Sequence, residues 1–398
     1  MSKINDLIKK LCPNGVEYKN IKDLCLENFW VMPSTPKYQT EGIPYITSKN
    51  IRNGIVMFND VKYITEDDYK SISNNRPIKE NDFLVSMIGT IGEVGIVKSD
   101  DLPFYGQNMY LLRLNTELVS IKFFYHYFTS DKVRNILLGE KNNGNQGYLK
   151  TKNIEMLKIP CPPLEIQEEI VRILDKFGEL EAKLEAELEA RKSQYEFWHG
   201  KLLNTENSNQ QYITLGDIGK VCMCKRIMKN DTSDSGDIPF YKIGTFGKQA
   251  DAYISYDIFN DYKNRFSYPK KGEILVSCSG TIGRSVVFDG EDAYFQDSNI
   301  VWLSNDESKV LNKFLYYFYQ TSPWNISDGG TIKRLYNNQF ISVKVPLYSL
   351  EEQKKIVNIL ERFDKLINDI SVGLPAEIEL RRKQYEYYRN KLLSFEEI

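Results

Sequence analysis

The sequence predicts an α+β protein with two strand-rich domains, related by a pseudo-twofold repeat and separated by two long antiparallel coiled-coil helices. The clearest repeat is residues 85–92 (Val-Ser-Met-Ile-Gly-Thr-Ile-Gly), which return as residues 276–283 (Val-Ser-Cys-Ser-Gly-Thr-Ile-Gly). Two further blocks repeat in the same order, 159–167 with 345–353 and 191–203 with 381–393. A spacing of about 190 residues indicates duplication of a whole domain together with its connector.

The repeat divides the chain of 398 residues into four segments. The predicted segments are a first strand-rich domain at 1–163, a first spacer helix at 164–204, a second strand-rich domain at 205–349 and a second spacer helix at 350–398.

Short apolar runs between Gly, Pro and Asn predict the strands of both domains. The runs lie at 43–46, 83–85 and 110–114 in the first domain and at 238–243, 274–276 and 299–303 in the second. We expect one helix per domain, at 120–138 and 309–320, since both segments are dense in aromatic residues.

The connectors show the apolar spacing of coiled-coil helices. Steps of three and four residues dominate from Ile166 to Leu202, and a second copy runs from Ile356 to Leu392 through Ile370. The second copy has four extra residues around Pro375, so we expect a kink, or a break with a new helix starting near that proline. Each seam needs a partner. The other copy is the expected partner, in antiparallel packing, and packing of each helix on its own domain is the alternative.

Composition restricts the function classes. The formal net charge is −2, which argues modestly against a nucleic-acid binder, although the connector 164–203 alone holds 6 basic against 10 acidic residues. The absence of a run of eighteen apolar residues predicts a cytoplasmic protein with no membrane contact. Six scattered cysteines and two histidines predict no metal site, and Cys222 and Cys224 are expected in strands.

Catalytic signatures are absent from the sequence. It holds no phosphate-binding Gly-x-x-x-x-Gly-Lys-Ser/Thr and no Gly-x-Gly-x-x-Gly after a strand. We therefore expect no catalytic residue and no cofactor in this chain. The Gly-Thr-Ile-Gly turns are expected to serve the backbone, because glycine accepts positive φ.

The loops between the predicted strands repeat in position but not in sequence. They offer Lys and Arg for phosphates and Gln, Asn and Arg for base edges, so they are candidate DNA contacts, with solvated turns as the alternative. The candidates are Lys49, Arg52, Gln107, Asn108, Gln146 and Lys150 in the first half and Thr245, Lys248, Gln296, Ser298, Lys333 and Arg334 in the second.

Three stretches resemble the specificity subunit of type I restriction-modification systems. Residues 159–167 (Ile-Pro-Cys-Pro-Pro-Leu-Glu-Ile-Gln) and 373–385 are similar to the helical conserved regions of that family. Residues 12–18 (Cys-Pro-Asn-Gly-Val-Glu-Tyr) are similar to the opening of its first target recognition domain. The resemblance covers essentially the whole chain.

The resemblance implies a non-catalytic, sequence-specific DNA-binding subunit. Segments 1–163 and 205–349 would be target recognition domains that read the two halves of a bipartite, asymmetric site in double-stranded DNA. The implied partners are two modification (methyltransferase) subunits and the restriction (motor and nuclease) subunits, which would carry S-adenosylmethionine, ATP and Mg²⁺. This sequence lacks the Asn/Asp-Pro-Pro-Tyr/Phe element of adenine methyltransferases.

Two other functions remain open from the residues. One is a self-contained DNA-modifying enzyme with a fused recognition module, which would act on DNA without a partner. The other is a coiled-coil scaffold that binds only proteins, which would show no salt-dependent DNA binding.

Overall fold

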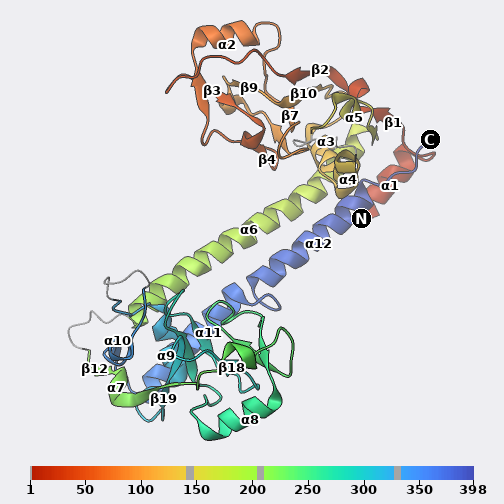
Figure 1. Cartoon of the computed structure of the whole chain (residues 1–398). Helices are drawn as coiled ribbons and strands as arrows, with labels where there is room; N and C mark the ends of the chain where they lie inside the picture. The colour runs from red at the N-terminus through yellow and green to blue at the C-terminus, as the bar shows by residue number, and fades with distance from the viewer. Residues whose placement is uncertain (1, 140–147, 204–209, 327–332) are drawn as a thin grey trace. The chain divides into compact units, whose positions relative to one another are not determined.

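The chain is described by a computed structural model over residues 2–139, 148–203, 210–326 and 333–398 (Figure 1). It divides into two compact units. The first unit comprises Met1–Leu184 with Ile378–Ile398, and the second comprises Glu185–Glu377. Each unit holds one strand-rich domain and parts of the long helices.

The domain of the first unit contains a four-stranded antiparallel sheet and a smaller mixed sheet. The four-stranded order is β2 (Cys25–Val31), β10 (Met109–Leu114), β7 (Phe83–Ser86), β8 (Val94–Ile96). The smaller sheet is β6 (Lys62–Ile64), β3 (Ile43–Ile46), β9 (Tyr105–Gly106), and two pairs complete the strands: β4 (Ile51–Arg52) with β5 (Ile55–Val56), and β1 (Tyr18–Asn20) with β11 (Lys158–Pro160).

Alternating side chains of β7 serve two cores, as expected for a strand that is buried on both faces. Phe83 lies on the face covered by α3 (Ile121–Phe128), where its ring is 4.9 Å from that of Phe124. Leu84 points to the opposite face and belongs to the cluster that contains the small sheet. The four-stranded sheet is therefore the shared wall between two apolar clusters.

The predicted helix 120–138 is wrong as a single element, because the structure has two. After α3 the hydroxyl of Thr129 donates to the carbonyl of Tyr125 at 2.7 Å, and that of Ser130 donates to Tyr127 at 2.6 Å. Such side-chain bonds compete with the helical ladder, so α4 (Asp131–Gly139) starts anew. One helix per domain was also too few, since this domain has α1 (Ser2–Leu11), α2 (Glu66–Ser73) and α5 (Thr151–Glu155) as well.

The domain of the second unit repeats this topology. Its four-stranded sheet is β13 (Gly219–Met223), β19 (Ile300–Asn305), β16 (Ile274–Ser277), β17 (Ser285–Val287). The others are β15 (Tyr253–Ile254), β14 (Ile238–Tyr241), β18 (Tyr294–Phe295), and β12 (Tyr212–Thr214) with β20 (Lys344–Pro346). Its helices are α7 (Leu215–Ile218), α8 (Tyr256–Arg265), α9 (Asn312–Gln320) and α10 (Asn337–Ile341), so here too one helix was too few. Cys222 lies in β13 as predicted, whereas buried Cys224 follows the end of that strand.

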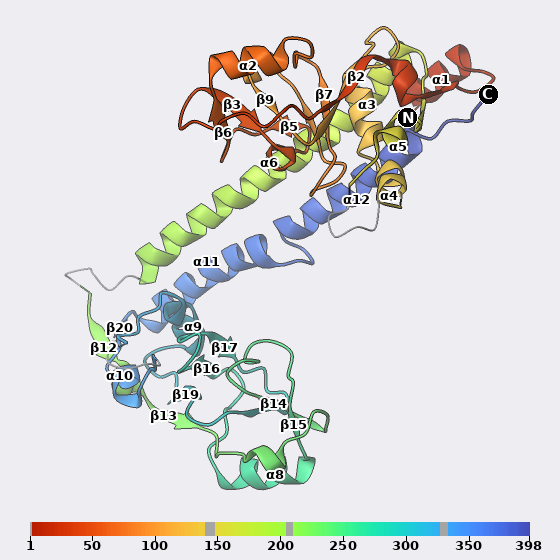
Figure 2. The same cartoon turned by 45° about the horizontal axis from the view of Figure 1, so that its top comes forward.

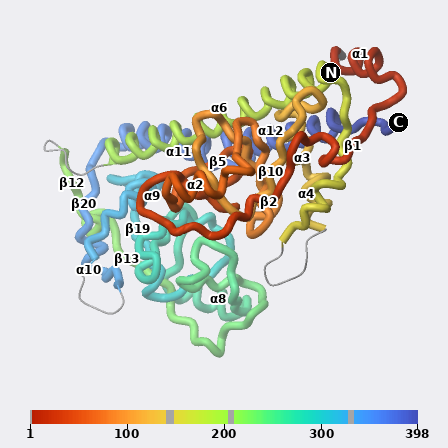
Figure 3. The backbone as a smooth tube through the Cα atoms, turned by 90° about the horizontal axis from the view of Figure 1, so that it is seen from above, coloured from red at the N-terminus to blue at the C-terminus, as the bar shows by residue number. Residues whose placement is uncertain are grey.

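The first long helix, α6 (Leu164–Leu203), is continuous over 40 residues. In the first unit it lies beside α12 (Leu374–Leu392) (Figures 1 and 3), where Phe177 stacks on Tyr388 with ring centroids 5.4 Å apart. One turn further along α6, Glu181 accepts a hydrogen bond from Arg382 at 2.5 Å. Residue numbers rise on one helix as they fall on the other, which confirms the antiparallel pairing within this unit.

In the second unit α6 pairs with α11 (Leu350–Asn368), where the rings of Tyr195 and Phe363 are 6.3 Å apart. The alternative packing also contributes. The first turns of α6 lie on their own domain, because Ile166, Ile170 and Leu174 are buried in its core.

The predicted break near Pro375 is confirmed. Helix α11 ends at Asn368, α12 starts at Leu374, and Pro375 is its second residue (Figure 2). At Gly373 a Cβ atom would lie 2.6 Å from the carbonyl oxygen of Asp369, so the turn requires glycine. Placing Ile370 in the apolar seam was wrong, since it lies in this break and is 86% exposed. No helix in the described ranges has the length and apolar character needed to cross a membrane.

Candidate nucleic-acid interface

Three loops of the first domain meet at one end of its strands. The backbone N–H of Gln107 donates to Ile46 at 3.1 Å, which joins the loop after β9 to the end of β3. Met87 donates to the carbonyl of Asn108 at 3.1 Å and accepts from Leu149 at 3.0 Å. The predicted contact positions Gln107, Asn108 and Lys150 are therefore brought together around the turn that follows β7.

The turn after β7 owes its shape to two glycines. Gly89 and Gly92 both have φ of +81°, and the repeated turn has Gly280 at +64° and Gly283 at +84°. This confirms the prediction that these glycines serve the backbone. A Cβ on Gly89 would lie 3.9 Å from the hydroxyl of Ser48, so the segment that carries Lys49 is also near this turn.

Three candidate cations of the first domain are exposed to solvent. Lys49 lies two residues before β4, Arg52 is the last residue of β4, and Lys150 directly precedes α5. Exposed Lys and Arg on loops that share one end of a sheet can neutralise phosphates along a backbone. Gln146 lies outside the described residues.

The second domain repeats the same backbone links. Gln296 donates from its backbone N–H to Tyr241 at 2.9 Å. Cys278 donates to Asn299 at 2.7 Å and accepts from Leu335 at 2.8 Å. Loops that differ in sequence are thus held on one scaffold in both domains.

Several predicted contact residues also hold the loops in shape. The Oε1 atom of Gln107 accepts from the hydroxyl of Tyr45 at 3.3 Å, and that of Gln296 accepts from the backbone N–H of Ile243 at 2.9 Å. Thr245 closes its own turn, since its hydroxyl oxygen accepts from the N–H of Lys242 at 3.1 Å.

Asn108 and Ser298 both have left-handed backbone conformations, with φ of +65° and +50°, and Ser298 directly precedes Asn299, which takes the place of Asn108 in the second domain. The guanidinium of Arg334 donates to the carbonyl of Ser298 at 2.7 Å. Lys248 and Lys333 are exposed, and Lys333 interacts with other groups of the chain. The DNA contacts of all these residues stay predictions.

The structure adds two candidates that sequence reasoning missed. Tyr148 is 40% exposed and pairs by a backbone bridge with Ile88, so it is held at the turn after β7, two residues before Lys150. Arg226 lies near the Gln296 loop, where its Nε donates to Asp297 at 2.9 Å. The sequence offered two signals for them: the tyrosine lies close to Lys150, and the arginine lies in a loop. Such residues are common on protein surfaces, so neither signal was specific.

Both histidines have structural partners. His126 Nδ1 lies 3.0 Å from the hydroxyl of Tyr385, and its Nε2 lies 3.0 Å from Asp175. Burial lowers the pKa of His126, and the Asp175 carboxylate partly offsets this. His199 Nε2 lies 3.0 Å from the carbonyl of Tyr317, and burial lowers its pKa too.

Within the described residues no three His, Cys, Asp or Glu side chains gather in a group that could hold a metal ion. What the structure does present is two separate sets of polar and cationic loops. Each set suits binding to a polyanion with base-edge contacts.

A family model described as the type I restriction modification DNA specificity domain matches the chain twice, at 13–190 and 207–380. A Haemophilus influenzae protein named as a type I restriction enzyme specificity subunit is 45% identical over 402 aligned positions, 98% of each chain. The EcoR124I/EcoR124II specificity subunit of Escherichia coli is 33% identical over 267 positions, 62% of this chain and 65% of that one.

Two solved structures share the fold. One is a chain from a type I R-M system, with a TM-score of 0.63, 16% identity and coverage of 96% of this chain and 98% of that one. The other is the HsdS subunit from Thermoanaerobacter tengcongensis, with a TM-score of 0.54, 16% identity and coverage of 96% and 97%.

Proposed function

Since this chain belongs to the type I restriction modification DNA specificity family, we propose that it reads a bipartite, asymmetric site in double-stranded DNA. As a specificity subunit it is a non-catalytic component of a type I system. Each strand-rich domain would bind one half-site through the loops gathered around its Gly-Thr-Ile-Gly turn.

One observation carries the proposal. The two domains repeat the backbone bonds that join the loops, while the side chains on those loops differ. Both domains have a Gln and an Asn at equivalent positions, Gln107 and Asn108 in the first and Gln296 and Asn299 in the second, but the second domain places Asp297 and Ser298 between them. Because base edges are read by side chains, different loops on one scaffold support two different half-sites.

In this arrangement the exposed cations would contact phosphates, and the amide and hydroxyl side chains would face base edges. Lys49, Arg52, Lys150 and Lys248 are the phosphate candidates, because they are exposed. The side chains of Gln107, Thr245, Gln296 and Arg334 also hydrogen-bond within the loops, so we propose that they set loop shape as well as read bases.

We further propose that two modification subunits and the restriction subunits dock on this chain in the cytoplasm. S-adenosylmethionine, ATP and Mg²⁺ would be bound by those partners. The long helices would set the distance between half-sites. At 1.5 Å per residue, the 40 residues of α6 make a helix about 60 Å long.

The direct test expresses the chain with its modification subunit in a host that lacks adenine methylation, and maps the methylated bases by single-molecule sequencing. We expect one interrupted motif with two different halves. A palindromic motif would contradict two different half-sites, and methylation by the purified chain alone would favour the self-contained enzyme.

The spacer is tested by inserting one helical turn in α6 and another in α12. Each turn adds about 5.4 Å, so we expect the unread gap in the motif to lengthen by about one to two base pairs. An unchanged gap in the methylation map would overturn the role of the helices in spacing.

The cation assignments are tested by the salt dependence of DNA binding. Each substitution among Lys49→Ala, Arg52→Ala and Lys248→Ala should reduce the slope of log K against log salt by about 0.9 if a phosphate contact is lost. Lys176→Ala, which removes an exposed charge from α6, is the matched control and should leave the slope unchanged. A wild type that shows no salt-dependent DNA binding would favour a protein-only scaffold.

A further inference from the structure

The edge strand β8 of the first domain is covered by the chain itself. The hairpin formed by β4 and β5 turns at Gly54, whose N–H donates to the carbonyl of Val94 at 3.0 Å. The N–H of Ile96 donates back to Gly54 at 3.1 Å. Two outward polar groups of β8, the carbonyl of Val94 and the N–H of Ile96, are thus satisfied by one residue of the hairpin.

Apolar side chains of the hairpin fill the space beside this edge. A Cβ on Gly95 would lie 3.0 Å from Ile51 and 3.2 Å from Val56, so the absence of a side chain at Gly95 admits both. Ile51 and Val56 are buried in the cluster that contains the small sheet.

In the second domain the loop that holds Gly247 lies beside Val286, but within the part of the chain that the structure describes it leaves outward polar groups of the equivalent edge unpaired. Register pairs Leu84 with Gly95 in the first domain and Leu275 with Val286 in the second, so β17 occupies the place of β8. The groups that correspond to the satisfied groups of β8 are the carbonyl of Ser285 and the N–H of Val287. Neither has a hydrogen-bond partner among the described residues, and Val287 is 40% exposed.

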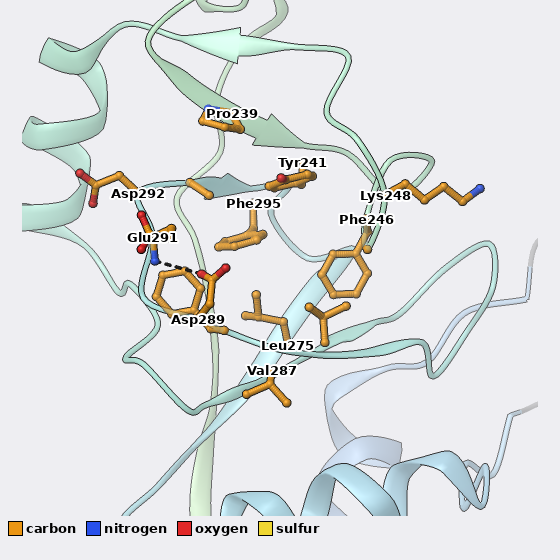
Figure 4. A pocket seen from close by; sticks show the side chains of 14 residues that line it. Pro239, Tyr241, Phe246, Lys248, Leu275, Val287, Asp289, Glu291, Asp292 and Phe295 are labelled. Atoms are coloured by element: carbon orange, nitrogen blue, oxygen red, sulfur yellow. Dashed lines mark hydrogen bonds between the residues drawn. The ribbon is translucent and has the colours of Figure 1, made fainter. Parts of the chain in front are cut away.

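A pocket of about 180 Å³ opens beside this edge (Figure 4). Phe246, Phe295 and Leu275 form its apolar floor, and Val286 and Val287 of β17 form its wall. The pocket is smaller than sites for drug-sized ligands, which are typically 300 Å³ or more. Its size and lining instead suit one aliphatic or aromatic side chain.

The rim of the pocket is acidic. Asp289 and Glu291 are exposed on it, and both carboxylates lack a basic partner among the described residues, whereas Asp292 pairs with Lys263 at 2.8 Å. The side chain of Lys248 extends away from the aromatic floor (Figure 4). Carboxylates at this rim repel phosphates and attract a basic side chain.

We propose that the edge of β17 and its pocket receive an extended segment of a partner protein, as an added strand. The segment would place an aliphatic or aromatic side chain in the pocket and a Lys or Arg near Asp289 and Glu291. It would take the place that hairpin β4–β5 takes in the first domain. Main-chain bonds to an exposed edge with a side-chain pocket are the usual basis of strand addition.

The probe is a fluorescent peptide with the sequence of residues 49–57, because this segment combines the apolar and basic residues of the natural hairpin. Its binding to the full chain is followed by fluorescence anisotropy. We expect saturable binding at peptide concentrations up to about 1 mM. Failure to saturate in this range would overturn the proposal.

Variants separate strand addition from nonspecific attraction. Val287→Pro removes the outward N–H and should lower the affinity at least tenfold. Asp289→Asn with Glu291→Gln keeps the surface folded and should weaken binding several-fold. Val286→Gly reproduces Gly95 and should strengthen it.

Two controls complete the test. Circular dichroism shows whether the Val287→Pro variant is folded. If that variant is unfolded, the peptide affinity of the Asp289→Asn, Glu291→Gln variant provides the test. Equal affinity of that surface variant and the wild type would overturn the role of the rim. Displacement of the peptide by short duplex DNA would show that the probe binds the loop surface instead, and would overturn the assignment to β17.

Discussion

The two four-stranded sheets have the same strand order, but they differ in the charged residues at corresponding positions of two neighbouring strands. In the first domain Arg113 donates to both carboxylate oxygens of Asp82 at 2.8 Å and also pairs with Glu27. In the second domain the strand register places Ser304 opposite Lys220, where the first has Arg113 opposite Glu27.

Both domains keep a buried carboxylate that accepts from a backbone N–H. Lys79 donates to Asp82 at 2.7 Å, and Lys270 donates to Glu273 at 2.6 Å. The duplicated feature is thus the backbone-capped carboxylate, while the guanidinium belongs to the first domain alone. The backbone of a repeat can be preserved while the electrostatics that stabilise it are rebuilt.

Among the substitutions considered, removal of the Arg113 side chain should destabilise the first domain most. Arg113→Ala leaves the fully buried Asp82 without its cation, so we expect a loss of about 3–5 kcal/mol in the free energy of unfolding. Urea unfolding measures the loss, and hydrogen exchange of β7 and β10 shows that the first domain is affected. Ser304→Ala at the equivalent position is the matched control. Equal losses in the two variants would contradict the difference between the domains.

The next largest effect should be equal in the two domains. Gln167 and Gln353 are both fully buried, and each amide bonds two carbonyls and one N–H of its own domain. Replacing either by Ala leaves these buried groups unpaired, so we expect a loss of about 2–4 kcal/mol for each.

Differential scanning calorimetry of the two glutamine variants tests this equality. The exposed Gln384→Ala on α12 serves as control and should change stability by less than about 0.5 kcal/mol. Stability losses that differ by more than about 1.5 kcal/mol between the two buried sites would show that the halves are not equivalent there.

Replacing Gly95 by valine, the residue at the equivalent position of the second domain, should reduce the free energy of unfolding by less. Gly95→Val places a side chain where Ile51 and Val56 pack, and overpacking of this kind costs about 1–3 kcal/mol. Hydrogen exchange should show loss of protection at the N–H groups of Gly54 and Ile96. Unchanged protection there would mean that the hairpin does not depend on glycine at this position.

The smallest effect concerns pH. Burial raises the pKa of Glu273, although the N–H of Lys270 opposes this. A raised folded pKa means that the stability from this carboxyl is present below its unfolded pKa and is lost as the pH rises through the folded one. Relative to Glu273→Gln, the wild type should lose stability as the pH rises from the ordinary range of glutamate carboxyls towards neutrality.

Because glutamine can keep the bond from Lys270 but does not titrate, any additional pH dependence of the wild type belongs to the Glu273 carboxyl. Urea midpoints measured across this pH range for both proteins provide the check. Parallel stability curves would show that Glu273 does not contribute to the pH dependence.

Prediction from sequence succeeded where the signal was local or repeated. The strands at 83–85 and 274–276 are β7 and β16, and Pro375 marked the start of α12, because proline and apolar periodicity constrain the backbone directly. It failed at Thr129 and Ser130, whose side chains end α3 by bonding nearby carbonyls. It also failed at Ile370, where apolar spacing continues through the break.

The repeat located the candidate loops in the sequence. It did not predict which of their side chains hydrogen-bond within the loops. Gln296 accepts a hydrogen bond from the N–H of Ile243, which lies 53 residues earlier in the chain. This contact depends on how the two segments approach each other, so no local sequence pattern predicts it. Tyr148 and Arg226 were missed for the same reason, since exposure beside another loop is a tertiary property.

The sequence by itself determined the duplication, the family, the long helices and the glycine turns, because each depends on residue order or on backbone preference. Only the tertiary structure decided which loops meet around those turns, that Arg113 compensates a buried Asp82, and that β17 keeps an open edge where β8 is covered. These features depend on contacts between residues far apart in the chain. At such contacts a single difference is enough. Gly95 leaves room for the hairpin β4–β5, whereas the equivalent Val286 carries a side chain, although the apolar pattern of the two strands is similar.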